Sequence, residues 1–387
     1  VSLGIGLAVG LVLIAKVYFE QSYDDFYPDR DRVYQVWAKY QQNGGELKDY
    51  PQTSGGIAPT MQQQIPEIET VTRYTSFGDW TFTMTDTKMK YSGRCIIADS
   101  CFFDILPRPM LIGNAKEVLS TPMYVLISSR IAKNIGGDVI GKNFTVDNSP
   151  GRTMTIGGVF EEVPENSHSR YDVIVSMASA GRFMWEGSPT NMLGNDRYIS
   201  YVKLHKGVNP LALEEQVRTF VNSYFPPEEQ QKVGLSIDFS FHKLDNLHKE
   251  LPQVKRMTWI LSLLAFALIF TAVMNYILIV ISSIVNRSKE VAVHKCYGAS
   301  ENNIHGMMFG EALVHIVLSL ILALLLILAF RGTVEELLAT SLDSLLLSNG
   351  SLVLLGICIL VFFVSGFMPG SLYARIPVAS AFRNYRE

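Results

Sequence analysis

Long apolar stretches alternate with one long stretch of mixed polarity along this chain. An uncharged run covers 259–285, and further apolar runs cover 312–330 and 352–374. A helix rises about 1.5 Å per residue, so each run can cross most or all of a bilayer core of about 30 Å. The opening run, 1–19, is apolar apart from Ser2 and Lys16, and no small-x-small cleavage site follows it. We interpret it as a further span with a truncated start and not as a signal peptide. The pattern therefore predicts four transmembrane helices.

The intervening block, 20–255, contains no apolar run of membrane length. Alternation predicts strands at 32–40, 68–74, 80–84, 124–128, 141–146, 154–160, 172–177 and 197–204, with short helices at 57–65 and 129–134. A longer amphipathic helix follows the last strand, ends at Pro226-Pro227, and has Leu213, Val217, Phe220, Val221 and Tyr224 on one face. Short strands with few helices are typical of an α+β domain, and the block is long enough for its own core.

Charges in the loops indicate the orientation. Residues 286–305 contain Arg287, Lys289, His294 and Lys295, and the C-terminal tail contains Arg375, Arg383 and Arg386. The loop 331–350 contains Arg331 together with Glu335, Glu336 and Asp343. The positive-inside rule places 286–305 and the C-terminus in the cytoplasm, and four spans then place the N-terminus there too. The large block 20–255 is therefore expected outside the inner membrane.

Composition limits the chemistry. The mean hydropathy is +0.19. The net charge is −3, so there is no general basic excess, and nucleic acid is not an expected partner. Four cysteines are too few for a disulfide scaffold, although Cys95 and Cys101 are close enough in sequence for a pairing to stay open. The sequence has no P-loop, HExxH, CxxC or GxSxG motif, and its seven histidines are scattered. We therefore predict no catalytic, cofactor-binding or metal-binding residues.

A few polar residues fall in or near the apolar runs. Glu311 and His315 are spaced i, i+4 near the start of the third run, where an interfacial pair is favoured over a proton relay. Asn275 is interpreted as a hydrogen-bonding group between helices. Lys16 is long enough to extend to the membrane interface. The glycine pairs at 136–137 and 157–158 are interpreted as turn or bulge glycines.

The stretch 287–300, RSKEVAVHKCYGAS, resembles the signature R-x-K-E-[IV]-[AG]-x-x-[KR]-x-x-G-A-[ST] of MacB/FtsX-type ABC transporter permeases. Supporting stretches lie at 23–27, 31–34, 136–142, 156–160 and 164–168, and the tail with Pro369, Ile376-Pro377-Val378 and Arg383 fits the family ending. The soluble stretches are most similar to permeases of Bacteroidetes-type bacteria. The resemblance covers essentially the whole chain.

The resemblance implies three parts: a first transmembrane helix at 1–19, a MacB-like periplasmic core domain at 20–255, and an FtsX-like permease domain at 256–387. Within the last part, 286–305 would be a cytoplasmic segment that couples the permease to an ABC ATPase subunit. Its expected contact residues are Arg287, Lys289, Glu290, Val291, Val293, Lys295, Gly298, Ala299 and Ser300. The charged ones would form ion pairs with the ATPase, and Gly298 would end a helix.

In such proteins the permease is a dimer, or a pair of permease halves, in a bacterial inner membrane, and a two-lobed external domain moves with ATP binding and release. The implied function is export or mechanotransmission, with a periplasmic adaptor, an outer-membrane partner or a hydrolase as further partners. An alternative is an FtsX-like signalling protein that activates a cell-wall hydrolase. A membrane-anchored external enzyme would require a polar catalytic cluster, and the sequence shows none.

Overall fold

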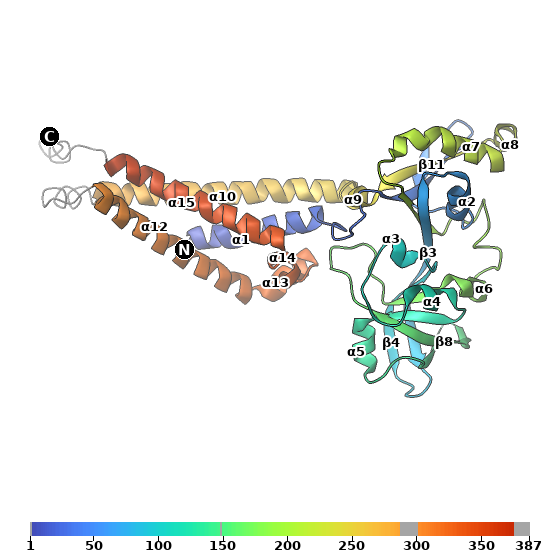
Figure 1. The fold of residues 1–387 in the computed structure, drawn as a ribbon. Coiled ribbons are helices and arrows are strands. Elements are labelled where there is room, and N and C mark those ends of the chain that lie inside the picture. Colours follow the sequence, from blue (N-terminus) through green and yellow to red (C-terminus); the bar gives the residue numbers. More distant parts are fainter. Residues whose placement is uncertain (1, 148, 287–300, 375–387) are drawn as a thin grey trace, which may run out of the picture. The chain divides into compact units, whose positions relative to one another are not determined.

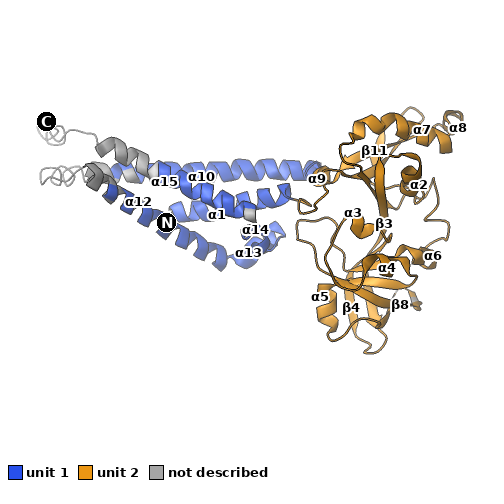
Figure 2. Ribbon diagram, in the orientation of Figure 1, with its two compact units in different colours: residues 1–22, 249–387 blue, residues 23–248 orange. Residues whose placement is uncertain are grey.

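The structure, a computed structural model, describes residues 2–147, 149–286 and 301–374, and it divides into two compact units (Figure 2). The α+β unit contains Tyr23–His248. The helical unit combines Val1–Ser22 with Lys249–Glu387. The chain therefore passes between the units twice, after Ser22 and after His248.

A mixed sheet of eleven strands forms the frame of the α+β unit (Figure 1). Its strands are β1 (Val33–Gln42), β2 (Lys48–Tyr50), β3 (Ile68–Met84), β4 (Lys90–Ala98), β5 (Met110–Ile112), β6 (Tyr124–Ser128), β7 (Asn143–Val146), β8 (Ser149–Phe160), β9 (Val173–Ser176), β10 (Ile199–Leu204) and β11 (Leu235–Lys243). Their order is β11-β1-β10-β3-β4-β9-β6-β8-β5, with β2 beside β1 and β7 between β3 and β8. Only the pairs β4–β9 and β6–β8 are parallel among the described strands. The predicted α+β fold is confirmed.

Short helices connect and cover these strands. They are α2 (Ile57–Gln64), α3 (Phe102–Ile105), α4 (Ala115–Ser120), α5 (Ser129–Ile135), α6 (Ala180–Phe183), α7 (Glu214–Tyr224), α8 (Pro227–Val233) and α9 (Leu244–Leu247). Helix α7 buries Val217, Phe220 and Val221 against the half of the sheet that contains β1, β10 and β11, as its pattern predicted. Tyr224 is an exception, because its side chain is 41% exposed.

Strand β3 joins the two halves of the α+β unit. Its first part pairs with β10 and its second part with β4, so one strand contributes to the core around β1 and to the core around β6 and β8. The sequence predicted two strands here, at 68–74 and 80–84, and this was wrong. The pairing of β3 with β4 shifts at a bulge between Ser76 and Gly78, where Gly78 has a φ of +78°. The bulge lets β3 continue through residues whose sequence resembles a turn.

The glycine pair at 157–158 lies at a second bulge, as expected. Val125 of β6 pairs with Ile156, whereas Leu126 pairs with Gly158, so Gly157 is the extra residue. A Cβ atom on Gly158 would lie 2.8 Å from Leu126 Cδ2 and 2.9 Å from the Ile112 carbonyl oxygen. The close approach of neighbouring backbone therefore explains why glycine occupies this strand position.

We expect Gly158→Ala to lower the free energy of unfolding by about 1–3 kcal/mol, the usual cost of overpacking a core. Thermal or urea unfolding followed by tryptophan fluorescence measures the change. Gly151→Ala is the matched control in the same strand, because a Cβ there would meet no heavy atom within 4 Å. The control should stay within about 0.5 kcal/mol of the parent chain. Equal losses in both variants would contradict the steric explanation.

The described residues of the helical unit form four long helices, α1 (Ser2–Gln21), α10 (Pro252–Asn286), α12 (Glu301–Ala329) and α15 (Asn349–Ala374). Helix α1 packs against α10 and α12, and α15 packs against the same two helices. Two short helices, α13 (Arg331–Leu338) and α14 (Leu342–Leu346), occupy the expected loop 331–350, where Arg331 forms ion pairs with Glu335 and Asp343.

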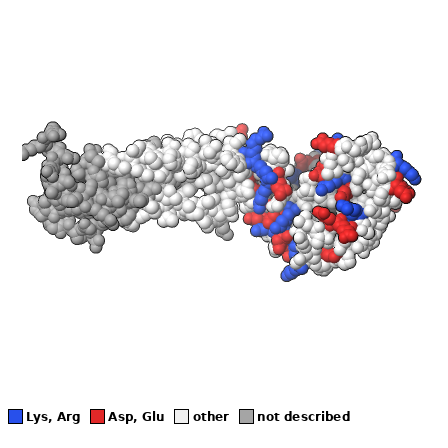
Figure 3. Space-filling model, turned by 90° about the horizontal axis from the view of Figure 1, so that it is seen from above, with Lys and Arg blue, Asp and Glu red and all other residues white. Residues whose placement is uncertain are grey.

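Figure 3 shows almost no charged side chains on the visible, described surface of the long helices. Trp259 and Phe266 of α10 are 74% and 67% exposed, which is typical of a lipid-facing surface.

Glycines on α1 allow the helices to approach closely. A Cβ on Gly6 would lie 2.8 Å from Ala272 Cβ, and one on Gly10 would lie 2.8 Å from Ile269 Cγ1, both on α10. A Cβ on Gly4 would lie 2.7 Å from Leu322 Cδ2 on α12. Helices in lipid associate through such van der Waals contact between small residues. The first helix is therefore an integral part of the bundle.

Within the described residues, Leu3–Gln21 and Pro252–Ile279 are long and apolar enough to cross a membrane. Leu313–Ala329 and Arg331–Leu338 qualify only together, and they meet at a 70° bend, while the apolar stretch Gly350–Val364 is shorter. Two or three spans are thus identified, and the predicted count of four is not confirmed.

Lys16 does not extend to an interface as the sequence suggested. Its side chain is buried, and Nζ lies 2.6 Å from Glu20 Oε1 and donates to Thr340 Oγ1 at 2.8 Å. Burial of a cation between helices requires such partners, because an unpaired buried charge is costly. The pair fastens the last turns of α1 to the connection between α13 and α14.

Candidate functional site: a polar network and an arginine-lined cavity

The nine expected coupling residues lie within 287–300, outside the described residues. The structure describes the helices on either side, α10 ending at Asn286 and α12 beginning at Glu301. The side chain of Glu311 also lies outside the described part, so its pairing with His315 stays a prediction. Asn275 is half-buried on α10, next to the buried Tyr276.

Cys95 and Cys101 are not bonded to each other, and within the described residues both thiols are free. Cys95 is buried in β4, while the Cys101 thiol donates to the Val71 carbonyl oxygen at 3.0 Å. Burial raises the pKa of Cys101 to about 11. The disulfide that the sequence left open is therefore absent from the structure.

Aromatic stacking and an ion pair join the two ends of the α+β unit. The rings of Tyr23 and His248 are stacked, with centroids 3.6 Å apart and planes 8° from parallel. Arg30 Nε lies 3.1 Å from Asp245 Oδ1. The segments that connect this unit to α1 and to α10 are consequently held together within the unit itself.

A buried polar network begins immediately after this junction, at Asp24. Its side chain is fully buried, and its φ of +58° is one that Asp tolerates better than most residues. Ser167 Oγ donates to Asp24 Oδ1 at 2.6 Å, and His168 Nδ1 hydrogen-bonds to Asp24 Oδ2. His168 Nε2 lies 2.9 Å from the hydroxyl of Tyr201 on β10. The network therefore fixes the start of the unit to both the 164–171 loop and the central sheet.

The same loop holds a buried arginine. Ser169 Oγ lies 2.6 Å from the Tyr27 hydroxyl, and Arg108 Nη2 donates to the carbonyl oxygen of Ser169. The guanidinium carbon of Arg108 lies 5.2–5.8 Å from the ring centroids of Phe102, Phe103, Phe160 and Tyr171. Arg108 is only 6% exposed, and its Nε has no hydrogen-bond partner in the part of the chain that the structure describes. Burial lowers the pKa of this arginine, because the charged form loses its hydration.

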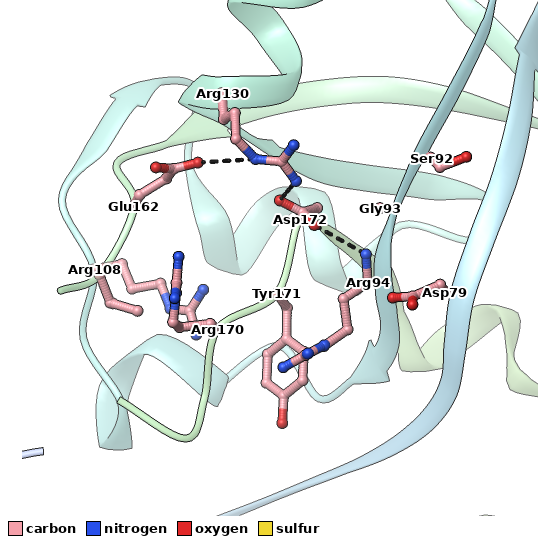
Figure 4. Close-up of a pocket in the computed structure, with 11 residues that line it drawn as sticks. Asp79, Ser92, Gly93, Arg94, Arg108, Arg130, Glu162, Arg170, Tyr171 and Asp172 are labelled. Carbon is pink, nitrogen blue, oxygen red and sulfur yellow. Dashed lines mark hydrogen bonds and ion pairs between the residues drawn. The ribbon is translucent and has the colours of Figure 1, made fainter. Parts of the chain in front are cut away.

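Arg108 is part of the wall of a cavity of about 450 Å³ that also contains Arg94, Arg130 and Arg170 (Figure 4). The carboxylates in the wall are Asp79, Glu162 and Asp172. Arg130 lies between two of them, with Nη2 2.5 Å from Asp172 Oδ1 and Nε 3.4 Å from Glu162 Oε1 (Figure 4). Asp172 also accepts the backbone N–H of Arg94 at 2.9 Å. Strand β4, helix α5 and the 161–172 segment thus contribute to one polar cavity.

The sequence did not predict this site. Its residues are spread from Asp79 to Asp172, and no motif spacing links them. Two stretches that carried the family resemblance, 23–27 and 164–168, meet outside the cavity wall, in the polar network of Asp24, Ser167 and His168. Among the described residues, no group of three or more His, Cys, Asp or Glu residues has the arrangement needed for a metal ion.

Comparisons with known proteins agree with this architecture. Residues 1–220 match the MacB-like periplasmic core domain, and residues 262–378 match the FtsX-like permease C-terminal domain. A crystal structure of a domain of a putative permease protein from Porphyromonas gingivalis is 33% identical, with a TM-score of 0.51, over 56% of this chain and 91% of that one. No curated protein matches the sequence.

Two more distant structures also match. The periplasmic region of MacB from Actinobacillus actinomycetemcomitans is 14% identical, with a TM-score of 0.37, over 53% of this chain and 87% of that one. The extracellular domain of the noncanonic ABC-type transporter YknZ from Gram-positive bacteria is 10% identical, with a TM-score of 0.35, over 54% of this chain and 98% of that one. The first family match alone covers more than half of the chain. The chain belongs to the FtsX-like ABC transporter permeases that carry a MacB-like periplasmic core domain.

Proposed function

We propose that this chain is the permease subunit of an ABC transporter that couples ATP hydrolysis in a partner subunit to conformational work outside the membrane. The observation that carries the proposal is the presence, in one chain, of a MacB-like periplasmic core domain and an FtsX-like permease domain. Permeases of this family work with an ABC ATPase. In this proposal the ATPase binds segment 286–305 in the cytoplasm.

The helix contacts support a route for the coupling. The end of α10 and the start of α12 belong to the proposed segment, and both helices pack against α1 and α15. A displacement of the segment would therefore act on the whole bundle. Helices α1 and α10 also continue directly into the two ends of the α+β unit, after Ser22 and before Lys249. We propose that these two connections transmit the movement.

Inside the α+β unit, the Tyr23–His248 stack and the Arg30–Asp245 ion pair would make the two connections act together. The Asp24 network would then carry the movement to the 164–171 loop and to β10. Hydrogen-bond networks are one of the physical elements that carry coupling between distant sites. The output would be export of a cargo or mechanotransmission to a periplasmic partner.

The proposal includes a topology and an assembly. Four helices, at about 1–19, 259–285, 312–330 and 352–374, would cross the inner membrane, with 20–255 in the periplasm and both termini in the cytoplasm. The permease would act as a homodimer or as a paired half. The glycine contacts of α1 and its buried Lys16–Glu20 pair support its role as a packed span in this arrangement.

Purification of the tagged chain from its native membranes in mild detergent tests the proposal. We expect mass spectrometry to identify an ABC ATPase at near-equal stoichiometry. An outer-membrane or adaptor protein in the same sample would favour export, whereas a cell-wall hydrolase would favour the signalling alternative. Failure to recover an ATPase, even after crosslinking at 286–305, would contradict the permease assignment.

A further inference from the structure

The arginine-lined cavity has more arginine side chains without a carboxylate partner than carboxylates without an arginine partner. Four arginines and three carboxylates form part of its wall. Glu162 and Asp172 are both paired with Arg130. Arg94, Arg108 and Arg170 then face a single remaining carboxylate, Asp79. The cavity is therefore suited to an anion.

Arg108 is the strongest indication of a missing partner. A guanidinium with 6% exposure normally requires a carboxylate or phosphate, because burial of an unpaired charge is costly. Its polar neighbours are instead the phenols of Tyr27, Tyr74 and Tyr171 and the oxygens of Ser169. Burial raises the pKa of all three tyrosines, and that of Tyr171 to about 12, so they remain neutral and supply no countercharge. The Nε of Arg108 is also without a partner among the described residues.

Arg94 and Arg170 are exposed and form no ion pair among the described residues, so both can reach a ligand. In the view of Figure 4, Arg108 and Arg170 lie to the left of Tyr171, Arg94 comes from the strand to its right, and Asp172 lies above. A planar guanidinium binds two oxygens at once, which matches phosphate and carboxylate groups. Phosphate carries a charge of about −1.5 to −2 and three acceptor oxygens, so it suits three arginines better than a carboxylate does.

We propose that this cavity binds the phosphate group of an anionic ligand, with Arg94, Arg108 and Arg170 as the positive groups that hold it. The volume of about 450 Å³ leaves room for more than the phosphate itself. Free phosphate compounds and phospholipid headgroups share this chemistry. The inference does not depend on the proposed ATPase coupling, because binding is measured without nucleotide or partner protein.

Isothermal titration of the full chain in a non-ionic detergent tests the inference, with inorganic phosphate and a water-soluble short-chain phosphatidate as separate probes. We expect the parent chain to bind at least one probe, and the one that binds better identifies the source of the phosphate. Arg170→Gln should weaken binding by about 10- to 100-fold, the usual loss for a charge-assisted hydrogen bond. Arg170→Lys keeps the positive charge but loses the planar guanidinium, so its affinity for the probe should lie between those of the parent chain and Arg170→Gln.

Arg218→Gln is the matched control, because Arg218 is an exposed arginine on α7, outside the cavity wall. It should bind like the parent chain. Arg170 is itself exposed, so its variants should unfold at the parent temperature. The inference is overturned if the parent chain binds neither probe, or if Arg170→Gln and Arg218→Gln bind equally well.

Discussion

Glu290→Lys and Gly298→Pro should leave the chain folded and inserted but reduce the ATPase activity of the assembled transporter to that of the ATPase subunit alone. Reversing one charge of a buried, hydrogen-bonded interface pair costs about 2–5 kcal/mol of binding energy. Proline at the predicted helix end lacks the N–H that a C′ residue donates, and its φ is fixed near −65°. Both changes fall in the segment that we propose contacts the ATPase. ATP hydrolysis by purified complexes in proteoliposomes is the measurement.

Glu336→Lys provides a matched charge reversal for this experiment. Glu336 is exposed on α13, in the loop that we propose faces the periplasm. It should not change ATP hydrolysis. Normal activity in both segment variants would remove the coupling assignment, and an equal loss in Glu336→Lys would show that any charge reversal disturbs the complex.

Removal of the Asp24 carboxylate should produce the largest loss of stability in the α+β unit. Asp24→Ala removes hydrogen bonds from Ser167 and His168 and places alanine at a φ of +58°. We expect the free energy of unfolding to fall by about 3 kcal/mol, since hydrogen bonds to a buried charge contribute about 1.5–3 kcal/mol each and partly compensate one another. Thermal unfolding followed by tryptophan fluorescence measures the effect.

Two companion variants separate the causes. Asp24→Asn keeps the size and the tolerance for positive φ, so it isolates the loss of charge and should be less destabilising. Asp49→Ala removes an exposed carboxylate from β2 and should change stability by less than about 0.5 kcal/mol. If Asp24→Ala were as stable as Asp49→Ala, the network would not hold the start of the unit.

Local patterns in the sequence predicted the elements that have a regular period. The sequence pattern predicted strands β1, β6 and β10, helix α2 and the buried face of α7, although the structure buries both sides of β6 and β10. Strand β4 was not predicted, although its last four residues form a short buried apolar run like that of β6. Strand β11 was also missed, although Leu235, Ile237, Phe239 and Phe241 do alternate and provide a usable signal.

The site could not be predicted from spacing, because tertiary contacts create it. Asp24 and His168 are 144 positions apart, and Arg108 meets Ser169 across 61 positions. Each residue is unremarkable in its own segment, and only the folded sheet makes Arg108 a buried cation. The family resemblance identified the stretches that meet at Asp24 but gave them no role.

Hydrogen exchange in the α+β unit tests the central claim most directly. The complete complex with its ATPase would be compared in proteoliposomes with ATP, with ADP and without nucleotide. If ATP turnover moves this unit, amide exchange in 23–31 and 164–171 should differ between the nucleotide states in the parent chain and not in Glu290→Lys. Identical exchange in all states, with the ATPase bound and hydrolysing ATP, would contradict the account.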